Sequence, residues 1–263
     1  MRPNHVLRAW REGKQTIGGW LSVGNAYTAE QMAHAGFDWL CLDMQHGMVD
    51  YDDVRHMLPA ISTTTVVPIV RVPWNDPWIA MKVLDAGAYG VIVPLVNNRD
   101  EAARAVSACR YPPEGIRSFG PNRVMLYSGR DYAEHANREI ACIVMIETAD
   151  GLKNVDEIAR TPGVDCVYIG PADLAYGIGI TPLQMGQSKE HAEAVKRIRE
   201  CCHNAGIAVG IHTGSLEQTQ IYLRDGFNMV TLGSEAGFMT RLARQELAAA
   251  RKETHTEAVP TGY

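Results

Sequence analysis

The stretch Phe37-Asp38-Trp39-Leu40-Cys41-Leu42-Asp43-Met44-Gln45-His46 decides the fold, because a short apolar run ends abruptly in a carboxylate, an amide and an imidazole. An apolar run of this length is typical of a buried strand. The arrangement recurs at residues 66–70, which end in Arg71, at residues 140–146, which end in Glu147, and at residues 167–170, which lead into Pro171-Ala172-Asp173. Four strands are therefore predicted to direct polar groups to one place.

Eight short apolar segments alternate with helical segments along the chain, which predicts an α/β fold. This alternation fits a closed barrel or an open doubly wound sheet, and the number of strands favours a (β/α)8 TIM barrel. The chain of 263 residues matches the usual size of that barrel, roughly 250 residues. No G-x-G-x-x-G motif follows the first segment, as a dinucleotide-binding sheet would require. The segments are 16–23, 37–42, 66–70, 89–94, 140–146, 167–170, 207–211 and 229–233.

The chain is expected to form one domain. Residues 1–250 would make the barrel, including a short polar lead-in helix within residues 1–14, and residues 251–263 would make a polar C-terminal tail. Residues 111–129 are expected to form a long loop, and loops of this length in compact domains are usually functional or disordered.

Capping signals predict where three of the helices begin. Thr28 is followed three residues later by Gln31, which is the spacing of a capping box. Asp50 and Asp53 mark the start of the next helix, and Pro77 suits the first position of the one after it.

Composition argues for an ordinary soluble enzyme or binding protein. The chain is 46% hydrophobic and 21% charged with a net charge of -5, so it offers no basic surface for nucleic acid. No apolar run approaches 18 residues and residues 1–14 lack an apolar signal-peptide core, so we expect no membrane partner and a cytoplasmic location. No cysteine has zinc-ligand spacing, and reduced, buried cysteines are expected at positions 41, 109, 142, 166, 201 and 202.

Glu147 and Asp173 follow adjacent strands, so their carboxylates are predicted to converge. Two carboxylates with water and a chelating substrate are a usual way to hold Mg²⁺ or Mn²⁺. The alternative is a carboxylate pair neutralised by a neighbouring arginine. Ala172 and Asp173 are also predicted to lie in the first turn of a helix, where free backbone N–H groups suit a substrate carboxylate or simply form a capped turn.

Arg71 and His46 are the candidate catalytic side chains of the other two strands. A buried arginine must be paired, so Arg71 either makes a structural ion pair or stabilises an oxyanion formed during reaction. His46 is either a satisfied core histidine or a general base, and its charged neighbours favour the base. His212 ends the seventh segment with fewer such neighbours, and a structural role is the leading interpretation there.

The lysines distinguish between two chemistries. Schiff-base catalysis needs a lysine in the pocket, and none of the six lysines ends a predicted strand. The first strand also lacks the His-x-His of a paired-histidine metallohydrolase. Carbonyl chemistry in this chain is therefore expected to depend on a metal ion.

These residues resemble the HpcH/HpaI family of class II, metal-dependent pyruvate aldolases, which act on substrates such as 4-hydroxy-2-oxoheptanedioate and 2-dehydro-3-deoxyglucarate. The resemblance covers nearly the whole chain, and jointly the motifs are specific. They are Gly36-Phe37-Asp38-Trp39, Trp74-Asn75-Asp76-Pro77, Arg110-Tyr111-Pro112-Pro113-Glu114-Gly115-Ile116-Arg117, Ile146-Glu147-Thr148 and Ile169-Gly170-Pro171-Ala172-Asp173-Leu174.

The resemblance implies roles for individual residues. His46 would be the proton acceptor and Arg71 the transition-state stabiliser. Glu147 and Asp173 would hold Mg²⁺, Mn²⁺ or Co²⁺, and Ala172 with Asp173 would contact the substrate. The family also forms trimers paired into hexamers that exchange the last helix, so a homo-oligomer is implied here.

The resemblance further implies that Asp85 raises the basicity of the catalytic histidine. Asp85 lies about eight residues into a helix that begins at the catalytic face, which puts it on the order of 12 Å away. Either that helix is shorter than it appears from the sequence, a neighbouring subunit supplies the group, or Asp43 acts instead. Two positions depart from the family pattern, Gln45 in place of a glutamate and Met145 in place of a glutamine.

The reaction implied is reversible aldol cleavage of a 4-hydroxy-2-oxo acid to pyruvate or hydroxypyruvate and an aldehyde. Decarboxylation of oxaloacetate is an alternative, because it forms the same enolate. A third hypothesis is a non-catalytic barrel that binds a metal ion and a 2-oxo acid. The sequence does not distinguish between aldehyde acceptors.

Overall fold

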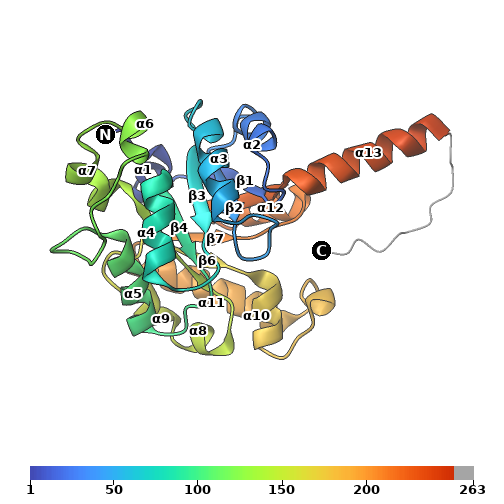
Figure 1. Ribbon diagram of the computed structural model, residues 1–263. Coiled ribbons are helices and arrows are strands. Elements are labelled where there is room, and N and C mark those ends of the chain that lie inside the picture. Colours follow the sequence, from blue (N-terminus) through green and yellow to red (C-terminus); the bar gives the residue numbers. More distant parts are fainter. Residues whose placement is uncertain (252–263) are drawn as a thin grey trace.

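A computed structural model describes residues 1–251, in which eight parallel strands close into a barrel in the order in which they occur along the chain. Helices alternate with the strands and surround them (Figure 1). The predicted (β/α)8 TIM barrel is therefore confirmed. The strands are β1 (Thr16–Leu21), β2 (Trp39–Asp43), β3 (Val67–Arg71), β4 (Gly90–Val93), β5 (Ala141–Ile146), β6 (Cys166–Ile169), β7 (Ala208–Ile211) and β8 (Met229–Ser234).

The helices include the expected lead-in helix and several short helices between β4 and β7. They are α1 (His5–Arg11), α2 (Ala26–Ala33), α3 (Tyr51–Ile61), α4 (Pro77–Ala86), α5 (Arg99–Cys109), α6 (Val124–Ser128), α7 (Tyr132–Glu139), α8 (Ala149–Lys153), α9 (Val155–Ala159), α10 (Pro171–Gly177), the 3₁₀ helix η1 (Pro182–Gln184), α11 (Lys189–Ala205), α12 (Leu216–Arg224) and α13 (Glu235–Arg251). The helix α6 occupies part of the predicted long loop 111–129. The proposed tail 251–263 begins at the last residue of α13 and otherwise lies outside the described residues.

Two of the three predicted helix starts are correct. Asp50 caps α3 in a reciprocal capping box with Asp53, and Pro77 is the first residue of α4. The capping box at Thr28 is wrong, because α2 begins earlier. Asn25 is the residue that caps it, and its side chain accepts a hydrogen bond from the Thr28 backbone N–H. An asparagine side chain is at least as good an N-cap as threonine, so the helix begins three residues earlier than predicted.

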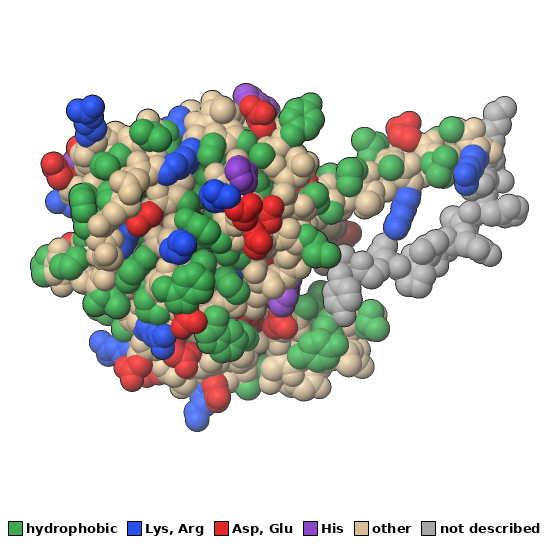
Figure 2. All heavy atoms as spheres, viewed as in Figure 1, with side chains coloured by type: hydrophobic (Ala, Val, Ile, Leu, Met, Phe, Trp, Pro, Cys, Tyr) green, Lys and Arg blue, Asp and Glu red, His purple; other side chains and the backbone are tan. Residues whose placement is uncertain are grey.

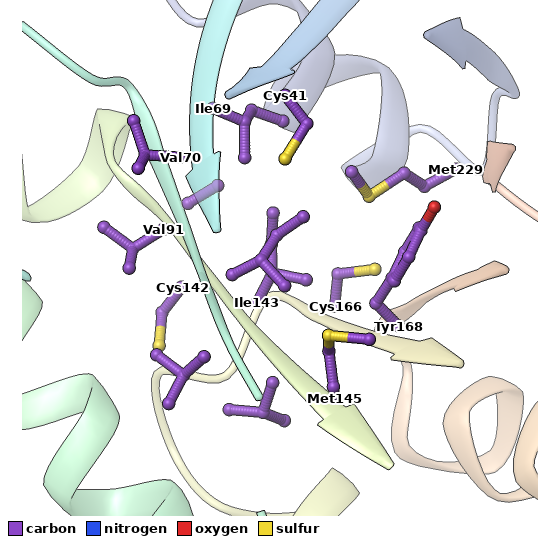
Figure 3. Close-up of a cluster of buried hydrophobic side chains, with 14 of the residues drawn as sticks. Cys41, Ile69, Val70, Val91, Cys142, Ile143, Met145, Cys166, Tyr168 and Met229 are labelled. Atoms are coloured by element: carbon purple, nitrogen blue, oxygen red, sulfur yellow. The ribbon is translucent and has the colours of Figure 1, made fainter. Parts of the chain in front are cut away.

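The interior of the barrel is a packed core, as expected for this fold. Figure 3 shows buried side chains of β2 to β6 and of β8, which lie on both faces of the barrel wall, and several of them carry sulfur. All six cysteines are buried and free, as predicted. The side chains labelled in Figure 3 are Cys41, Ile69, Val70, Val91, Cys142, Ile143, Met145, Cys166, Tyr168 and Met229.

The last helix, α13, leaves the barrel instead of packing against it (Figure 1). Glu235, its first residue, is the one buried residue of the helix, and its carboxylate accepts hydrogen bonds from the backbone N–H groups of Ser22 and Val23. Apolar side chains further along α13 stay exposed (Figure 2), with Met239 64%, Leu242 56% and Leu247 51% exposed. None of the helices in residues 1–251 has both the length and the apolar character needed to cross a membrane.

Candidate active site

Asp43 and Arg71 form a buried ion pair at the C-terminal ends of β2 and β3. The parallel register places the two residues side by side. The Arg71 guanidinium donates through Nε to Asp43 Oδ1 at 2.8 Å and through a terminal nitrogen to Oδ2 at 2.6 Å. Both side chains are buried. This two-point geometry fixes the plane of the guanidinium as well as its position.

Asp43 is also a hydrogen-bond acceptor for three other groups. The Trp20 indole donates to Oδ2 at 3.0 Å. The backbone N–H groups of Gln45 and His46 donate to Oδ1 at 3.1 and 3.3 Å. Although burial alone would raise it, the pKa of Asp43 is held below its usual value by the hydrogen bonds and charge of Arg71. Asp43 is therefore an ionised anchor at neutral pH.

His46 lies beyond this anchor, at the open end of the barrel. Its backbone is held by Asp43, whereas its side chain is exposed. Within residues 1–251 the imidazole makes no hydrogen bond or ion pair. The backbone of His46 is therefore fixed, while both ring nitrogens are free to accept a proton from a bound molecule.

Glu147 directly follows β5 and is only 2% exposed. It accepts a hydrogen bond from the backbone N–H of Leu95 at 2.9 Å, and Leu95 adopts a positive φ of 55° in doing so. Burial raises the pKa of Glu147 to about 7, the Leu95 N–H opposes this shift, and the charge of Asp173 adds to it. Unlike Asp43, Glu147 has no cationic partner in an ion pair among the described residues.

Asp173 and Ala172 lie in the first turn of α10, as predicted. Pro171 is the first residue of that helix, and no side chain caps it. Asp173 is exposed, so its carboxylate is available to a ligand. The N–H groups at the start of a helix have no acceptor within the helix, and those of Ala172 and Asp173 belong to this set.

The carboxylates fit a divalent cation. A carboxylate buried like Glu147 is costly to ionise without a neighbouring positive charge. The nearby charge of Asp173 makes the need for a cation larger. No cluster of three or more histidine, cysteine, aspartate or glutamate residues occurs in the described part of the chain. Two carboxylates would leave most coordination positions of Mg²⁺ to water and substrate, as is common for that ion.

The HpcH/HpaI aldolase/citrate lyase family matches residues 16–241 of this chain. The chain belongs to this family. A hydroxypyruvate/pyruvate aldolase from Rhizorhabdus wittichii is 42% identical over 248 residues, which cover 94% of this chain and 99% of the relative. A 4-hydroxy-2-oxo-heptane-1,7-dioate aldolase from Shigella sonnei is 37% identical, with 98% of both chains covered.

The fold agrees with solved structures of the family. The crystal structure of an HpcH/HpaI aldolase/citrate lyase family protein from Burkholderia cenocepacia superposes with a TM-score of 0.89 at 36% identity, and covers 94% of this chain and 99% of that one. Membership of the HpcH/HpaI family makes this protein a lyase, which excludes the hypothesis of a non-catalytic binding barrel.

Asp85, the predicted partner of the HpcH/HpaI histidine, makes no hydrogen bond or ion pair with His46 in the described part of the chain. The helix α4 continues to Ala86, so it is not shorter than the sequence suggests. Asp85 instead forms an ion pair of 2.8 Å with Arg117, whose side chain is fully buried. It lines a cavity of about 290 Å³ together with residues from α3, α4 and the segment before α6, namely Tyr51, Arg55, Lys82, Ala86, Gly120, Asn122 and Arg123.

The two departures from the HpcH/HpaI pattern occupy different surroundings. Met145 is 1% exposed and belongs to the packed interior (Figure 3). A Cβ added at Gly170 would lie 3.1 Å from the end of the Met145 side chain and 2.3 Å from a Glu147 oxygen, so both pack against this glycine. Gln45 is half-buried, and its side-chain oxygen is buried without a hydrogen-bond partner in residues 1–251.

Sequence reasoning missed three residues of the site. Trp20 donates to Asp43, and its ring lies 5.0 Å below the Arg71 guanidinium in a cation–π contact. Leu95 donates to Glu147 from its backbone, which no side-chain pattern could reveal. Tyr168 is fully buried inside the barrel. Trp20 could have been found from its place near the end of β1, where barrel enzymes carry functional groups.

Replacing Glu147 by glutamine should stabilise the metal-free protein at high pH. The folded-state pKa of about 7 lies above the reference value of 4.5. Between these values the folded protein keeps a proton that the unfolded chain has lost, so stability falls as pH rises through this window and stays low above it. At pH 8 metal-free Glu147→Gln should exceed the wild type by about 3 kcal/mol in urea unfolding, and at pH 4 the two should agree.

Glutamine keeps the acceptor for the Leu95 N–H, so the comparison isolates the charge. Glu193→Gln, on an exposed position of α11, is the matched control and should change little at either pH. A difference between Glu147→Gln and wild type that is the same at pH 4 and pH 8 would show that Glu147 does not ionise against its burial.

Proposed function

We propose that the protein is a class II, metal-dependent aldolase, which reversibly cleaves a 4-hydroxy-2-oxo acid into pyruvate or hydroxypyruvate and an aldehyde. The observation that carries the proposal is the contrast between two buried carboxylates at the strand ends. Asp43 is neutralised by an ion pair with Arg71, whereas Glu147 forms no ion pair with any of residues 1–251. The names of the R. wittichii and S. sonnei relatives support the same reaction class.

The donor substrate would bind between β3, β5 and α10. Glu147 and Asp173 would hold Mg²⁺, Mn²⁺ or Co²⁺, and the bound ion supplies a Lewis acid for the carboxylate and keto oxygens of a 2-oxo acid. The N–H groups of Ala172 and Asp173 donate to the substrate carboxylate. Arg71 donates to the keto oxygen and stabilises the negative charge that develops there. The pKa of Arg71 is raised: burial opposes its charged form, but the charges of Asp43 and Glu147 favour it more strongly. Arg71 and Glu147 therefore already attract each other in the free protein.

His46 would perform the proton transfers. In the direction of synthesis it takes a proton from C3 of the 2-oxo acid, directly or through a water, and leaves the electron pair in the enolate. The enolate C3 then forms a bond to the aldehyde carbon, and the aldehyde oxygen takes up a proton to become the 4-hydroxyl group. Cleavage is the reverse of these steps.

Removal of the metal ion should abolish activity, whereas borohydride should not. EDTA treatment should reduce aldol cleavage to background, and Mg²⁺, Mn²⁺ or Co²⁺ should restore it, because a site of two carboxylates binds reversibly. Borohydride with pyruvate should leave the protein active and unmodified by mass spectrometry. Every lysine in residues 1–251 lies in a helix or in the segment after α1.

Glu147→Ala and Asp173→Ala serve as variants for this test, and each should lose activity while remaining folded. Full activity after EDTA treatment, or pyruvate trapped on a lysine, would show that the metal-dependent scheme is wrong.

Oxaloacetate decarboxylation is a second candidate activity of the same site. Arg71 and Glu147, two of the residues that would stabilise an enolate, are buried, whereas His46 is exposed and its side chain makes no hydrogen bond to either of them within residues 1–251. Loss of CO2 from oxaloacetate produces the enolate without removal of a C3 proton. The enolate-stabilising residues could therefore act without His46.

His46→Ala should separate the two activities. We expect loss of aldol turnover by about 10²–10⁴-fold, the usual contribution of a general base, with decarboxylation of oxaloacetate largely retained. Exchange of the methyl protons of pyruvate in D2O should be lost in parallel with aldol turnover. If His46→Ala loses both activities and still binds Mg²⁺, His46 is more than the C3 base.

We further propose a homo-oligomer, with the trimers paired into a hexamer that the family resemblance implies. The exposed apolar residues of α13 support it, because a helix with such residues is stabilised by packing on another surface. The position of Asp85 supports it as well, since within one chain it faces away from His46, and an adjacent copy could bring it to that ring. The free cysteines suit a reducing compartment, and we propose the cytoplasm.

Complementation between two inactive variants should test the shared site. His46→Ala and Asp85→Asn should each have low activity alone. Co-expressed, they should regain about a quarter of wild-type activity, because random assembly places an intact His46 beside an intact Asp85 at one site in four. Asp76→Asn, at the start of α4, is a matched control that should stay active. If the mixed oligomers are no more active than the mean of the two variants measured alone, Asp85 does not act across subunits.

A further inference from the structure

His212 directly follows β7 and is not used by the reaction scheme above. Its Nδ1 atom lies 3.4 Å from the hydroxyl oxygen of Tyr168. Its ring meets the Trp20 ring edge-on, with 4.8 Å between the centroids and 82° between the planes. Its backbone N–H donates to the Ile169 carbonyl at the end of β6. These contacts hold the imidazole in one orientation.

The hydroxyl groups next to His212 determine which ring nitrogen carries the proton. Tyr168 and Thr231 are both fully buried, and their hydroxyl groups are hydrogen-bonded to each other. If Thr231 donates to Tyr168 and Tyr168 donates to Nδ1 of His212, every hydroxyl proton has an acceptor. In the reverse direction the Thr231 proton has no acceptor among the described residues, and an unpaired buried donor costs about 1–3 kcal/mol.

The first arrangement makes Nδ1 of His212 an acceptor and puts the proton on Nε2. Burial lowers the pKa of His212 to about 4, and the positive charge of Arg71 adds to this effect. At neutral pH the ring is therefore uncharged, with one N–H donor. Nε2 of His212 has no hydrogen-bond partner among the described residues, and it is not one of their buried unpaired polar atoms, so this nitrogen is accessible.

The position of His212 in the barrel suits the second substrate. The donor-binding groups proposed above lie on β3, after β5 and in α10. His212 follows β7, and its ring contacts Trp20 on β1, which in turn lies 5.0 Å from the Arg71 guanidinium. Trp20 and His212 therefore lie next to the place where Arg71 would hold the enolate, on the side of strands other than those that carry the proposed metal ligands and base.

We propose that His212 is a specificity-determining residue for the aldehyde. Its Nε2–H donates to the hydroxyl oxygen of an aldehyde that carries a hydroxyl group on the carbon next to the carbonyl. The proposal rests on the aldolase function proposed above. A neutral N–H group recognises an uncharged oxygen without attracting a negative charge. It therefore favours a hydroxylated aldehyde over an alkyl aldehyde of the same size.

Glycolaldehyde and propionaldehyde provide the test, because they differ by a hydroxyl group in place of a methyl group. The measured quantity is the ratio of kcat/KM for glycolaldehyde to kcat/KM for propionaldehyde, with saturating pyruvate and Mg²⁺. His212→Phe keeps a ring against Trp20 and removes the donor, and the ratio should fall about tenfold, as expected for one hydrogen bond to a neutral group. His212→Gln retains an N–H donor and should recover most of the wild-type ratio.

Deuterium exchange into pyruvate without aldehyde separates this proposal from the proposed function. Two results would overturn the role of His212 while the exchange still supports an aldolase. One is an unchanged ratio in His212→Phe, and the other is a ratio in His212→Gln as low as that in His212→Phe. Loss of the exchange in His212→Phe would place His212 on the donor side and overturn the proposal too. Absence of exchange in the wild type would overturn the aldolase function and, with it, this inference.

Discussion

The buried ion pair between Asp43 and Arg71 is the interaction on which the site depends. It forms because β2 and β3 pair in a register that puts the two residues side by side at the ends of their strands. Removing two charges from water is costly, and the cost is offset only when the geometry is good and the remaining lone pairs are used. Both conditions hold, since the contact is two-pronged and Trp20 and two backbone N–H groups occupy the other acceptor positions of Asp43.

The pair links the position of His46, the proposed base, to that of Arg71, the proposed oxyanion donor. Asp43 binds Arg71 with its carboxylate and binds the backbone of His46 with the same group. The guanidinium and the histidine backbone are therefore fixed relative to each other by one side chain. Trp20 then lies against both Asp43 and Arg71 and carries the arrangement to His212. A substrate that binds here meets groups that need little reorganisation, which is the main source of electrostatic catalysis.

Much of this arrangement could be predicted from the sequence. Charged residues at the ends of apolar segments must meet once the barrel closes, so Asp43, Arg71, Glu147 and Asp173 could be placed at one end of the barrel from their positions alone. What each carboxylate does could not be predicted, because that depends on which of them obtains the arginine. The register of β2 against β3 settles this, because it pairs Arg71 with Asp43, and Glu147 has no ion-pair partner among the described residues.

Other features depend on contacts that have no local signal. The hydrogen bond from Leu95 comes from a backbone group in a strained conformation. The network of Tyr168, Thr231 and His212 joins three strands that are far apart in the sequence. The family resemblance implies that Asp85 acts beside His46, but within one chain Asp85 forms an ion pair with Arg117. A contact between two copies of the chain would leave no signal in the sequence of one of them.

The departure at position 45 follows from the same electrostatics. The side-chain oxygen of Gln45 is buried without a partner, and its backbone is held by Asp43. A glutamate at this position would bring a second negative charge beside Asp43, whose two oxygens are already occupied. An unpaired amide oxygen costs far less to bury than an unpaired carboxylate. Gln45 thus adds no further carboxylate beside Asp43, and the charge that a divalent ion would neutralise is that of Glu147 and Asp173, after β5 and in α10.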